Sequence, residues 1–114
     1  MEKLVKIFKA LGDKSRLRIV KMLQHKSLCV CEITAILGLA TPTVSKHLSI
    51  LKEIEIIKDL KNGRWVEYSL NKNVKNMYLM GLLPLLSYWL ENDEQAKSDT
   101  EKINNVNREK LCSY

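Results

Sequence analysis

The sequence lacks the features that mark a membrane protein or a secreted protein. Its longest apolar stretch, residues 77–90, is shorter than the ~20 residues that a membrane helix needs, and it contains Gly81 and Pro84. The first residues have neither the apolar core nor the small-residue cleavage site of a signal peptide. We therefore expect a cytoplasmic protein that makes no contact with a membrane.

Catalytic motifs are also missing. The chain has no phosphate-binding glycine loop, no His-Glu-x-x-His pair and no pattern that places a nucleophile beside a base. Cys29 follows His25 by four residues, but a lone pair of this kind usually arises by chance. The sequence thus predicts a protein that is not an enzyme and requires no catalytic cofactor.

Residues that ligate metals are few. Three cysteines are an odd number, and the spacing Cys29-Val30-Cys31 argues against a disulfide framework, which leaves thiolate chemistry as the open possibility. No histidine occurs from residue 74 onward, and His25 and His47 stand in separate segments. Neighbouring spacings therefore provide no four-ligand zinc site.

What the chain does have is an uneven positive charge. Its 114 residues fit a single domain with a net charge of +6. Residues 1–72 contain 14 Lys and Arg against 7 Asp and Glu, whereas residues 73–114 contain 5 against 6. A basic domain attracts polyanions, of which nucleic acid is the commonest, so the first two thirds of the chain are the candidate binding region.

Apolar spacing and turn residues predict a mainly α fold with a small β-hairpin wing, a winged helix-turn-helix. Gly38 suits the left-handed position that ends a helix, and Thr41 and Pro42 suit the N-cap and first residue of the next. Asn62-Gly63 between two β-rich runs is a strong hairpin signal. The expected helices cover about residues 3–11, 13–24, 32–37, 41–52 and 74–90, and the expected strands cover residues 56–60 and 65–70, with Val66, Tyr68 and Leu70 facing inward.

These elements divide the chain in two. Residues 1–90 form the predicted DNA-binding and dimerisation domain. Residues 91–114 are polar with few apolar anchors, so we expect a mobile C-terminal tail that is helical in part at most.

A helix, a glycine turn, a second helix and a basic hairpin are the parts that winged-helix proteins use to bind double-stranded DNA. Short donors and acceptors on the second helix suit base edges and phosphates, and the hairpin suits a phosphate backbone or a minor groove. A protein-interaction module on the same fold is the alternative from another functional class. The candidate DNA-binding residues are Thr41, Thr43, Ser45, Lys46, His47 and Ser49 on the helix and Lys61, Asn62 and Arg64 on the hairpin.

Three separated motifs resemble the ArsR/SmtB family of metal-responsive repressors. They are residues 8–19 (FKALGDKSRLRI), residues 43–51 (TVSKHLSIL) and residues 62–70 (NGRWVEYSL), and the similarity extends over about residues 4–90. The resemblance implies a homodimer formed by the first and last helices, an inverted-repeat operator and release of DNA when an inducer binds. The last helix, which is apolar nearly all round, supports a dimer independently.

Cys29-Val30-Cys31 resembles the Cys-Val-Cys-x-x-Cys arsenite site of the arsenic-sensing members, but Thr34 stands at the third cysteine's position. Arsenite and antimonite favour thiolates, so the resemblance implies As(III) or Sb(III) as the inducer, with Cys112 as a candidate third ligand. Cysteines at i and i+2 lie on nearly opposite sides of a helix, so joint binding requires a distorted helix start.

Two alternatives share this scaffold. One is a thiol redox or reactive-sulfur switch, in which Cys112 pairs with Cys29 or Cys31. The other is a cadmium or lead sensor, in which an oxygen of Glu32 or of the N-terminal segment completes the ligand set.

Overall fold

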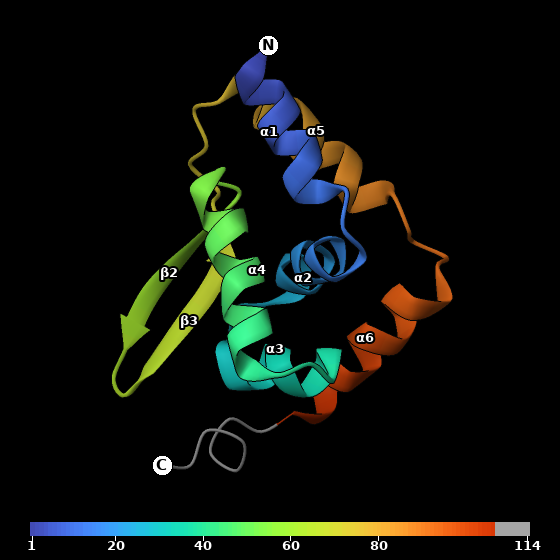
Figure 1. Ribbon diagram of the computed structural model, residues 1–114. Helices are drawn as coiled ribbons and strands as arrows, with labels where there is room; N and C mark the ends of the chain where they lie inside the picture. The colour runs from blue at the N-terminus through green and yellow to red at the C-terminus, as the bar shows by residue number, and fades with distance from the viewer. Residues whose placement is uncertain (107–114) are drawn as a thin grey trace.

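The computed structural model describes residues 1–106. The helices pack together, and a small sheet lies at one side of the molecule with its two long strands beside α4; this arrangement confirms the predicted mainly helical winged-helix fold (Figure 1). The elements are α1 (Glu2–Leu11), α2 (Lys14–His25), β1 (Leu28–Cys29), α3 (Val30–Leu37), α4 (Thr41–Glu53), β2 (Ile57–Asn62), β3 (Trp65–Leu70), α5 (Met77–Tyr88) and α6 (Glu94–Asn105).

The sheet has one more strand than the sequence predicted. Its antiparallel order is β1-β3-β2, with Leu28 opposite Tyr68 and Cys29 opposite Glu67. The sequence predicted no strand before residue 56, because a two-residue strand is too short to show an alternating pattern. The short strand β1 joins the hairpin directly to the start of α3.

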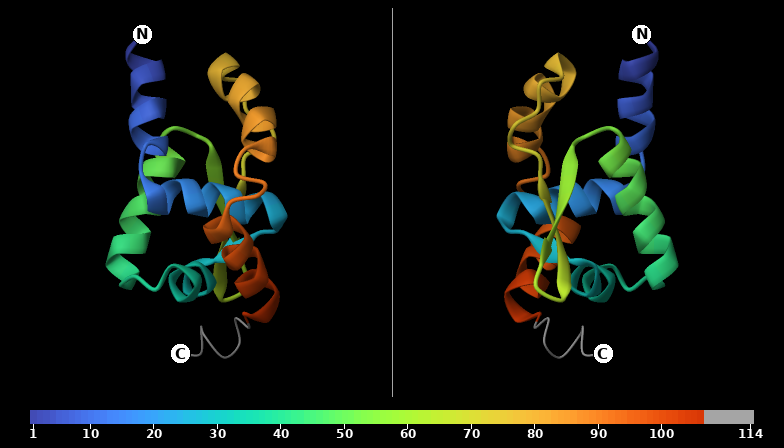
Figure 2. Two further views of the ribbon diagram at one scale, coloured as in Figure 1. Left: turned by 90° about the vertical axis from the view of Figure 1, so that its right-hand side faces the viewer. Right: turned by 90° about the vertical axis from the view of Figure 1, so that its left-hand side faces the viewer.

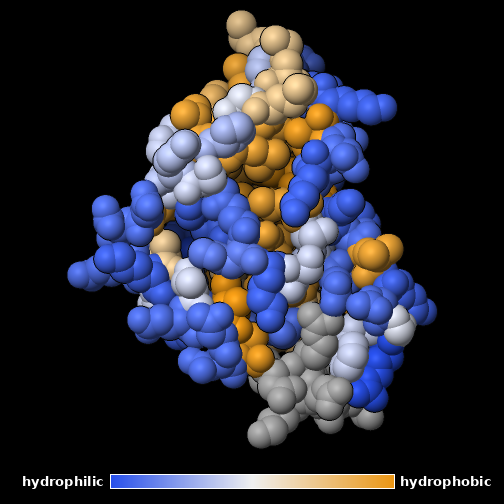
Figure 3. Space-filling view, turned by 180° about the vertical axis from the view of Figure 1, so that it is seen from behind, coloured by the Kyte–Doolittle hydropathy of each residue, from blue (hydrophilic) through white to orange (hydrophobic). Residues whose placement is uncertain are grey.

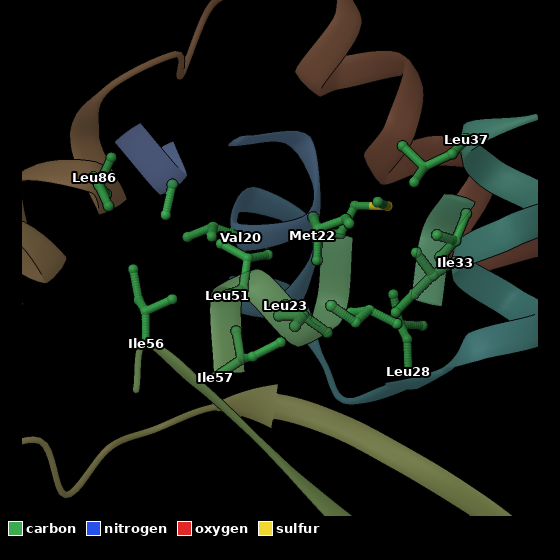
Figure 4. Packing of buried hydrophobic residues seen from close by; sticks show 14 of the residues in the cluster. Val20, Met22, Leu23, Leu28, Ile33, Leu37, Leu51, Ile56, Ile57 and Leu86 are labelled. Atoms are coloured by element: carbon green, nitrogen blue, oxygen red, sulfur yellow. The ribbon is translucent and has the colours of Figure 1, made fainter. Parts of the chain in front are cut away.

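The core is built around α2, which contacts α1, α4, α5, α6 and β3. Its side chains Ile19 and Val20 are completely buried. Because α2 lies at the centre, each surrounding amphipathic helix can bury its apolar face against it, and a short chain forms one core. Figure 4 shows Val20 and Met22 in the middle of this cluster, with Leu86 and Ile56 on one side and Leu28, Ile33 and Leu37 on the other.

The turn between α3 and α4 has the conformation that its glycine predicts. Gly38 has φ +69°, the left-handed region where a side chain is strained, and its N–H donates to the carbonyl of Thr34. The predicted N-cap of the following helix is displaced by one residue, because Ala40 is the N-cap and Thr41 is already helical. Ala40 provides no side-chain cap, and Pro42 lies within the first turn.

The apolar helix α5 is shorter than the predicted range of 74–90. Asn76 caps its start by accepting hydrogen bonds from the N–H groups of Tyr78 and Leu79, and Pro84 lies inside the helix rather than beginning a second one. Lys21 of α2 donates to the carbonyl of Leu86 at 2.8 Å and so fixes the end of α5. Within residues 1–106, no helix combines the length and the apolar character needed to cross a membrane.

The sequence predicted a mobile tail after residue 90, whereas the structure has a packed helix there, α6. Asp93 caps it through the N–H of Ala96, and the helix packs against α2 and α3 with Ile103 only 2% exposed. Periodicity did not reveal this helix, because its anchors are one isoleucine and the buried carboxylate of Asp99, which binds Arg18 of α2. The polar segment therefore contributes to the folded domain at least as far as the end of α6.

Candidate DNA interface and cysteine site

Helix α4 is amphipathic, with one apolar face and one polar face. Val44, Leu48 and Leu51 are at most 1% exposed and fix the helix to the core. This spacing of four and three residues leaves the opposite side of the helix in solvent. Five of the six predicted helix contacts are exposed there, namely Thr41, Thr43, Ser45, Lys46 and Ser49.

His47 is the sixth predicted contact on α4, and it differs from the others. Its side chain is only 15% exposed. The ring Nδ1 lies 3.1 Å from Nη1 of Arg16 and 3.9 Å from Oδ2 of Asp13, both near the start of α2. His47 is therefore turned toward the corner between α1 and α2, and Arg16 is a residue of this region that local sequence patterns could not reveal.

The hairpin exposes Lys61, Asn62 and Arg64 around the turn at Gly63, as predicted. The Arg64 guanidinium lies 4.6 Å from the centre of the Trp65 ring, a cation–π distance that favours one orientation of this arginine. β2 contacts α4, so the hairpin lies beside this helix (Figure 1).

Val66 departs from the inward orientation predicted for it. It shares a face of β3 with Tyr68 and Leu70, and those two residues pack against the core. Val66 lies nearer the turn, opposite Lys61, where the core ends, and it is 40% exposed. The predicted alternation of side chains along the strand is confirmed, but alternation alone does not predict how far the core extends along a strand.

Cys29 occupies the junction between the sheet and α3. It is 1% exposed, ends β1 and is the N-cap residue of α3. Its backbone N–H and its thiol both donate to Oε1 of Glu32, at 2.9 and 3.0 Å. Glu32 is itself only 2% exposed, so a buried carboxylate holds both the helix start and the sulfur. The signal in the sequence was Cys-x-x-Glu, a thiol version of the capping box.

The other predicted ligands are placed differently. Cys31 lies on the first turn of α3, is partly buried and is disulfide-bonded in this structure. Thr34, at the position of a third cysteine, has a buried hydroxyl oxygen without a hydrogen bond. Cys112 lies outside the described residues. Among residues 1–106, no group of three or more His, Cys, Asp or Glu side chains is arranged to hold a metal ion.

An apolar groove runs between α1 and α5. Phe8 and Trp89 at its rim are 55% and 49% exposed, which is unusual for large hydrophobic side chains. In Figure 2 the two helices stand apart, and Figure 3 shows hydrophobic side chains gathered over this upper part of the molecule. The groove has a volume of about 410 Å³, and its lining includes Phe8, Leu11, Leu17, Leu82, Trp89 and Leu90.

Comparison with known proteins places the chain in a family. Residues 13–59, which contain α2, α3 and α4, match the family described as bacterial regulatory protein, arsR family. An uncharacterised helix-turn-helix transcriptional regulator of Methanocaldococcus jannaschii is 48% identical over 68 residues, which are 59% of this chain and 76% of that protein. The arsenic resistance transcriptional regulator ArsR1 of Pseudomonas putida is 36% identical over 91 residues, which are 76% of this chain and 71% of that protein.

A third relative is named for a different metal. The cadmium resistance transcriptional regulatory protein CadC of Listeria innocua is 42% identical over 76 residues, which are 66% of this chain. The match spans 63% of that protein, which is less than two thirds of its length. Arsenic and cadmium regulators are thus both similar to this chain.

Solved structures agree with the sequence relatives. HlyU from Vibrio cholerae has 28% identity and a TM-score of 0.63, over 75% of this chain and 88% of that chain. The transcriptional repressor BigR from Xylella fastidiosa has 22% identity and a TM-score of 0.65, over 82% and 89%, and it supports the fold alone. From its family match and its relatives, the chain belongs to the arsR family and is a DNA-binding transcriptional repressor, not an enzyme.

Proposed function

We propose that this repressor binds an inverted-repeat operator as a homodimer and releases it when trivalent arsenic or antimony binds to its cysteine thiolates. The observation that carries the proposal is the position of Cys29, which joins the sheet of the hairpin to the helix that precedes α4. A ligand bound there acts on both candidate DNA-contacting elements.

The exposed face of α4 provides the contacts to the major groove in this proposal. Thr43, Ser45 and Ser49 offer hydroxyl groups to base edges and phosphates, and Lys46 adds a fixed charge. The N–H groups of the first turn, around Thr41, suit a phosphate. Lys61, Asn62 and Arg64 at the hairpin turn then follow the backbone or the minor groove beside the site.

The groove between α1 and α5 supports the homodimer. An exposed apolar surface of this kind costs free energy in water, and a second copy of the same groove buries it on both sides. A two-fold dimer presents two α4 helices related by symmetry, and this arrangement is read by an inverted repeat. Dimerisation and the form of the operator are therefore one proposal.

Cys29 and Cys31 supply two thiolates in the proposed inducer site, and Cys112 is the candidate third ligand. Trivalent arsenic is soft and prefers sulfur ligands, which bind as thiolates. When the Cys29 sulfur bonds to arsenic, the thiol proton leaves with a hydroxyl group of arsenite as water, and the sulfur can no longer donate to Oε1 of Glu32. The first turn of α3 is thereby destabilised, and the position of α4 changes with it.

A thiol-redox response is the second candidate. One observation favours it, which is that Cys31 is disulfide-bonded in this structure. In this alternative the oxidation state of Cys31, and not a bound metalloid, changes the start of α3. Arsenic binding needs the reduced form of Cys31, so the two candidates require opposite redox conditions.

Operator release measured by fluorescence anisotropy tests the proposal. A labelled duplex from the gene's own promoter is titrated with arsenite under reducing conditions, for wild type and for the variants Cys29→Ser, Cys31→Ser and Cys112→Ser. We expect release by wild type that is lost in the first two variants, and loss in the third makes Cys112 a ligand. Release by arsenite in a Cys29→Ser, Cys31→Ser double variant contradicts the proposal.

Parallel titrations separate the alternatives. Release by Cd²⁺ or Pb²⁺ but not by arsenite identifies a divalent-metal sensor, for which Glu32 is the candidate oxygen ligand. Release by a mild oxidant, reversed by a thiol reductant and absent in Cys31→Ser, identifies the redox candidate. DNA binding that falls little with rising salt contradicts operator recognition itself, because phosphate contacts require a steep salt dependence.

A further inference from the structure

We infer that His47 does not read a base but, held by Arg16, fixes the orientation of α4 against the end of α1. The inference concerns how the operator-binding surface of the proposed function is positioned, and it rests on that function. It assigns Arg16 and His47 as positioning residues and leaves base reading to the exposed side chains of α4.

Arg16 is anchored to the last turn of α1. Its Nε donates to the carbonyl of Ala10 at 2.6 Å, and its Nη2 donates to the carbonyl of Lys9 at 3.4 Å. The last carbonyls of a helix have no partner within the helix, and the negative end of the helix dipole lies there, so a guanidinium is well suited to this position. Two such bonds fix the planar group in one orientation.

The third side of the guanidinium faces His47. Nη1 of Arg16 lies 3.1 Å from Nδ1 of His47. A guanidinium only donates hydrogen bonds, so Nδ1 must accept, and the neutral ring must carry its proton on Nε2. Asp13 completes the corner: its carboxylate accepts from the backbone N–H of Arg16 at 3.0 Å and lies 3.9 Å from Nδ1 of His47.

Burial separates His47 from the other polar residues of α4. Its side chain is 15% exposed, whereas Lys46 before it is exposed. A base reader must extend into the groove, but the ring of His47 is occupied on the side of α1 and α2. Figure 2 shows the end of α1, the start of α2 and α4 meeting at this corner, and the three helices are in mutual contact.

The corner links two surfaces that have separate roles in the proposed function. α1 carries Phe8 and Leu11 of the apolar groove, and Ala10 between them is 3% exposed. A shift of α1 on dimer formation therefore reaches α4 through the Arg16 guanidinium. We infer that Arg16 and His47 set the angle between the two α4 helices of a dimer.

Nuclear magnetic resonance tests the contact without DNA. A long-range ¹H–¹⁵N spectrum of the full chain, recorded at a pH where His47 is neutral, identifies which ring nitrogen carries the proton. We expect the Nε2–H form in wild type and a mixture of forms in Arg16→Gln. Wild type with the proton on Nδ1 overturns the inference, because that nitrogen could not accept from Arg16.

Operator binding tests the positioning role. His47→Asn retains an acceptor at the place of Nδ1, so we expect affinity within about threefold of wild type, whereas His47→Leu loses about tenfold. Arg16→Lys should also lose affinity, and the double variant Arg16→Lys, His47→Leu should be little worse than either single variant, because both changes remove one contact. Lys46→Gln is the neighbouring control and should lower the salt dependence instead.

The outcomes separate this inference from the proposed function. The positioning role is overturned if the losses of operator affinity in Arg16→Lys and His47→Leu add in the double variant. It is also overturned if His47→Leu loses its preference at one base pair, because His47 is then a base reader. If wild type binds no operator, both the proposed function and the positioning role are contradicted. The ring nitrogen that carries the proton on His47 still tests, independently of DNA, whether Arg16 donates to Nδ1 of His47. Circular dichroism of each variant confirms that the affinity changes do not come from unfolding.

Discussion

The guanidinium of Arg18 donates two hydrogen bonds of 2.9 Å to the carboxylate of Asp99, which lies 81 residues later in the sequence. The side chains are 17% and 4% exposed, so the pair is largely shielded from water. Gln95 donates to the same carboxylate at 3.0 Å, and Arg18 also reaches the carbonyl of Ile36. Through this one arginine, α6 is joined to both α2 and α3.

Removal of Asp99 should therefore destabilise the protein. Asp99→Ala leaves the partly buried Arg18 cation without its partner, a loss of about 3 kcal/mol in the free energy of unfolding. In wild type, the hydrogen bond and the charge of Asp99 raise the pKa of Arg18. Arginine stays protonated in proteins even without such a partner, so the cation in the variant cannot avoid the cost by losing its proton. Urea unfolding measures the loss. Glu101→Ala, an exposed position of the same helix, is the control and should change stability by less than about 0.5 kcal/mol.

A second prediction concerns the acid limb of the stability curve. The backbone N–H of Arg16 is the main cause that lowers the pKa of Asp13 below its model-peptide value of 3.8. A lowered pKa means that the stabilisation is fully present above that value and is lost as the pH falls through the pKa of the folded state. Asp13→Ala should lower the free energy of unfolding by about 1 kcal/mol at pH 7, the usual effect of losing an N-cap side chain, and by less at pH 2 to 3.

Asp13→Asn is the matched variant for that measurement. Asparagine also caps helices well but does not titrate, so this variant should keep most of the stability at pH 7 and lack the acid-dependent part. Unfolding by urea at several pH values gives both quantities. A gap between wild type and Asp13→Ala that does not narrow in acid would show that the carboxylate contributes nothing through its charge.

The groove between α1 and α5 gives a third prediction. Phe8→Glu places a charge at the rim of the proposed dimer contact, where burial against a second copy is costly. We expect the variant to sediment as a monomer at concentrations where wild type is a dimer. Because Phe8 is 55% exposed in one chain, the monomer should remain folded by circular dichroism. Lys72→Glu, an exposed position outside the groove, controls for the added negative charge and should leave the dimer intact.

The hairpin gives a fourth prediction. If Lys61 and Arg64 contact phosphates, each alanine variant should reduce the slope of log affinity against log salt by about one per chain. Lys97→Ala, an exposed cation on α6, should leave the slope unchanged. Anisotropy titrations between about 50 and 200 mM salt resolve the difference. Equal slopes for all four proteins would exclude the hairpin from the DNA interface.

Local signals predicted most of the fold. The turn at Gly38 and the hairpin at Asn62-Gly63 need special backbone conformations that few residues adopt, so they could be read from neighbouring residues alone. Helix α6 could not, because its main anchor is the pairing of Asp99 with a residue 81 positions away. A polar helix with one buried apolar residue has the same composition as a disordered tail.

In the candidate site, too, local patterns predicted some features, whereas others depend on residues far apart in the sequence. The exposed face of α4 follows from helical periodicity, which places Val44 and Leu48 inside and their neighbours outside. The orientation of His47 depends on Arg16, which is 31 residues earlier, and no local pattern reports such a contact. The role of Glu32 was readable in principle, since Cys-x-x-Glu follows the capping-box spacing with a thiol in place of a hydroxyl.

Cys29 is at once the end of β1, the cap of α3 and a thiol that donates to Glu32. Where ligand binding and operator binding both depend on this junction, their free energies are coupled, and the coupling is reciprocal. A ligand that weakens operator binding by a given factor is itself bound more weakly, by the same factor, when the operator is occupied. Repressor free of DNA then captures the ligand at lower concentrations than repressor on its operator, and the number of unbound copies in the cell helps to set the threshold of the response.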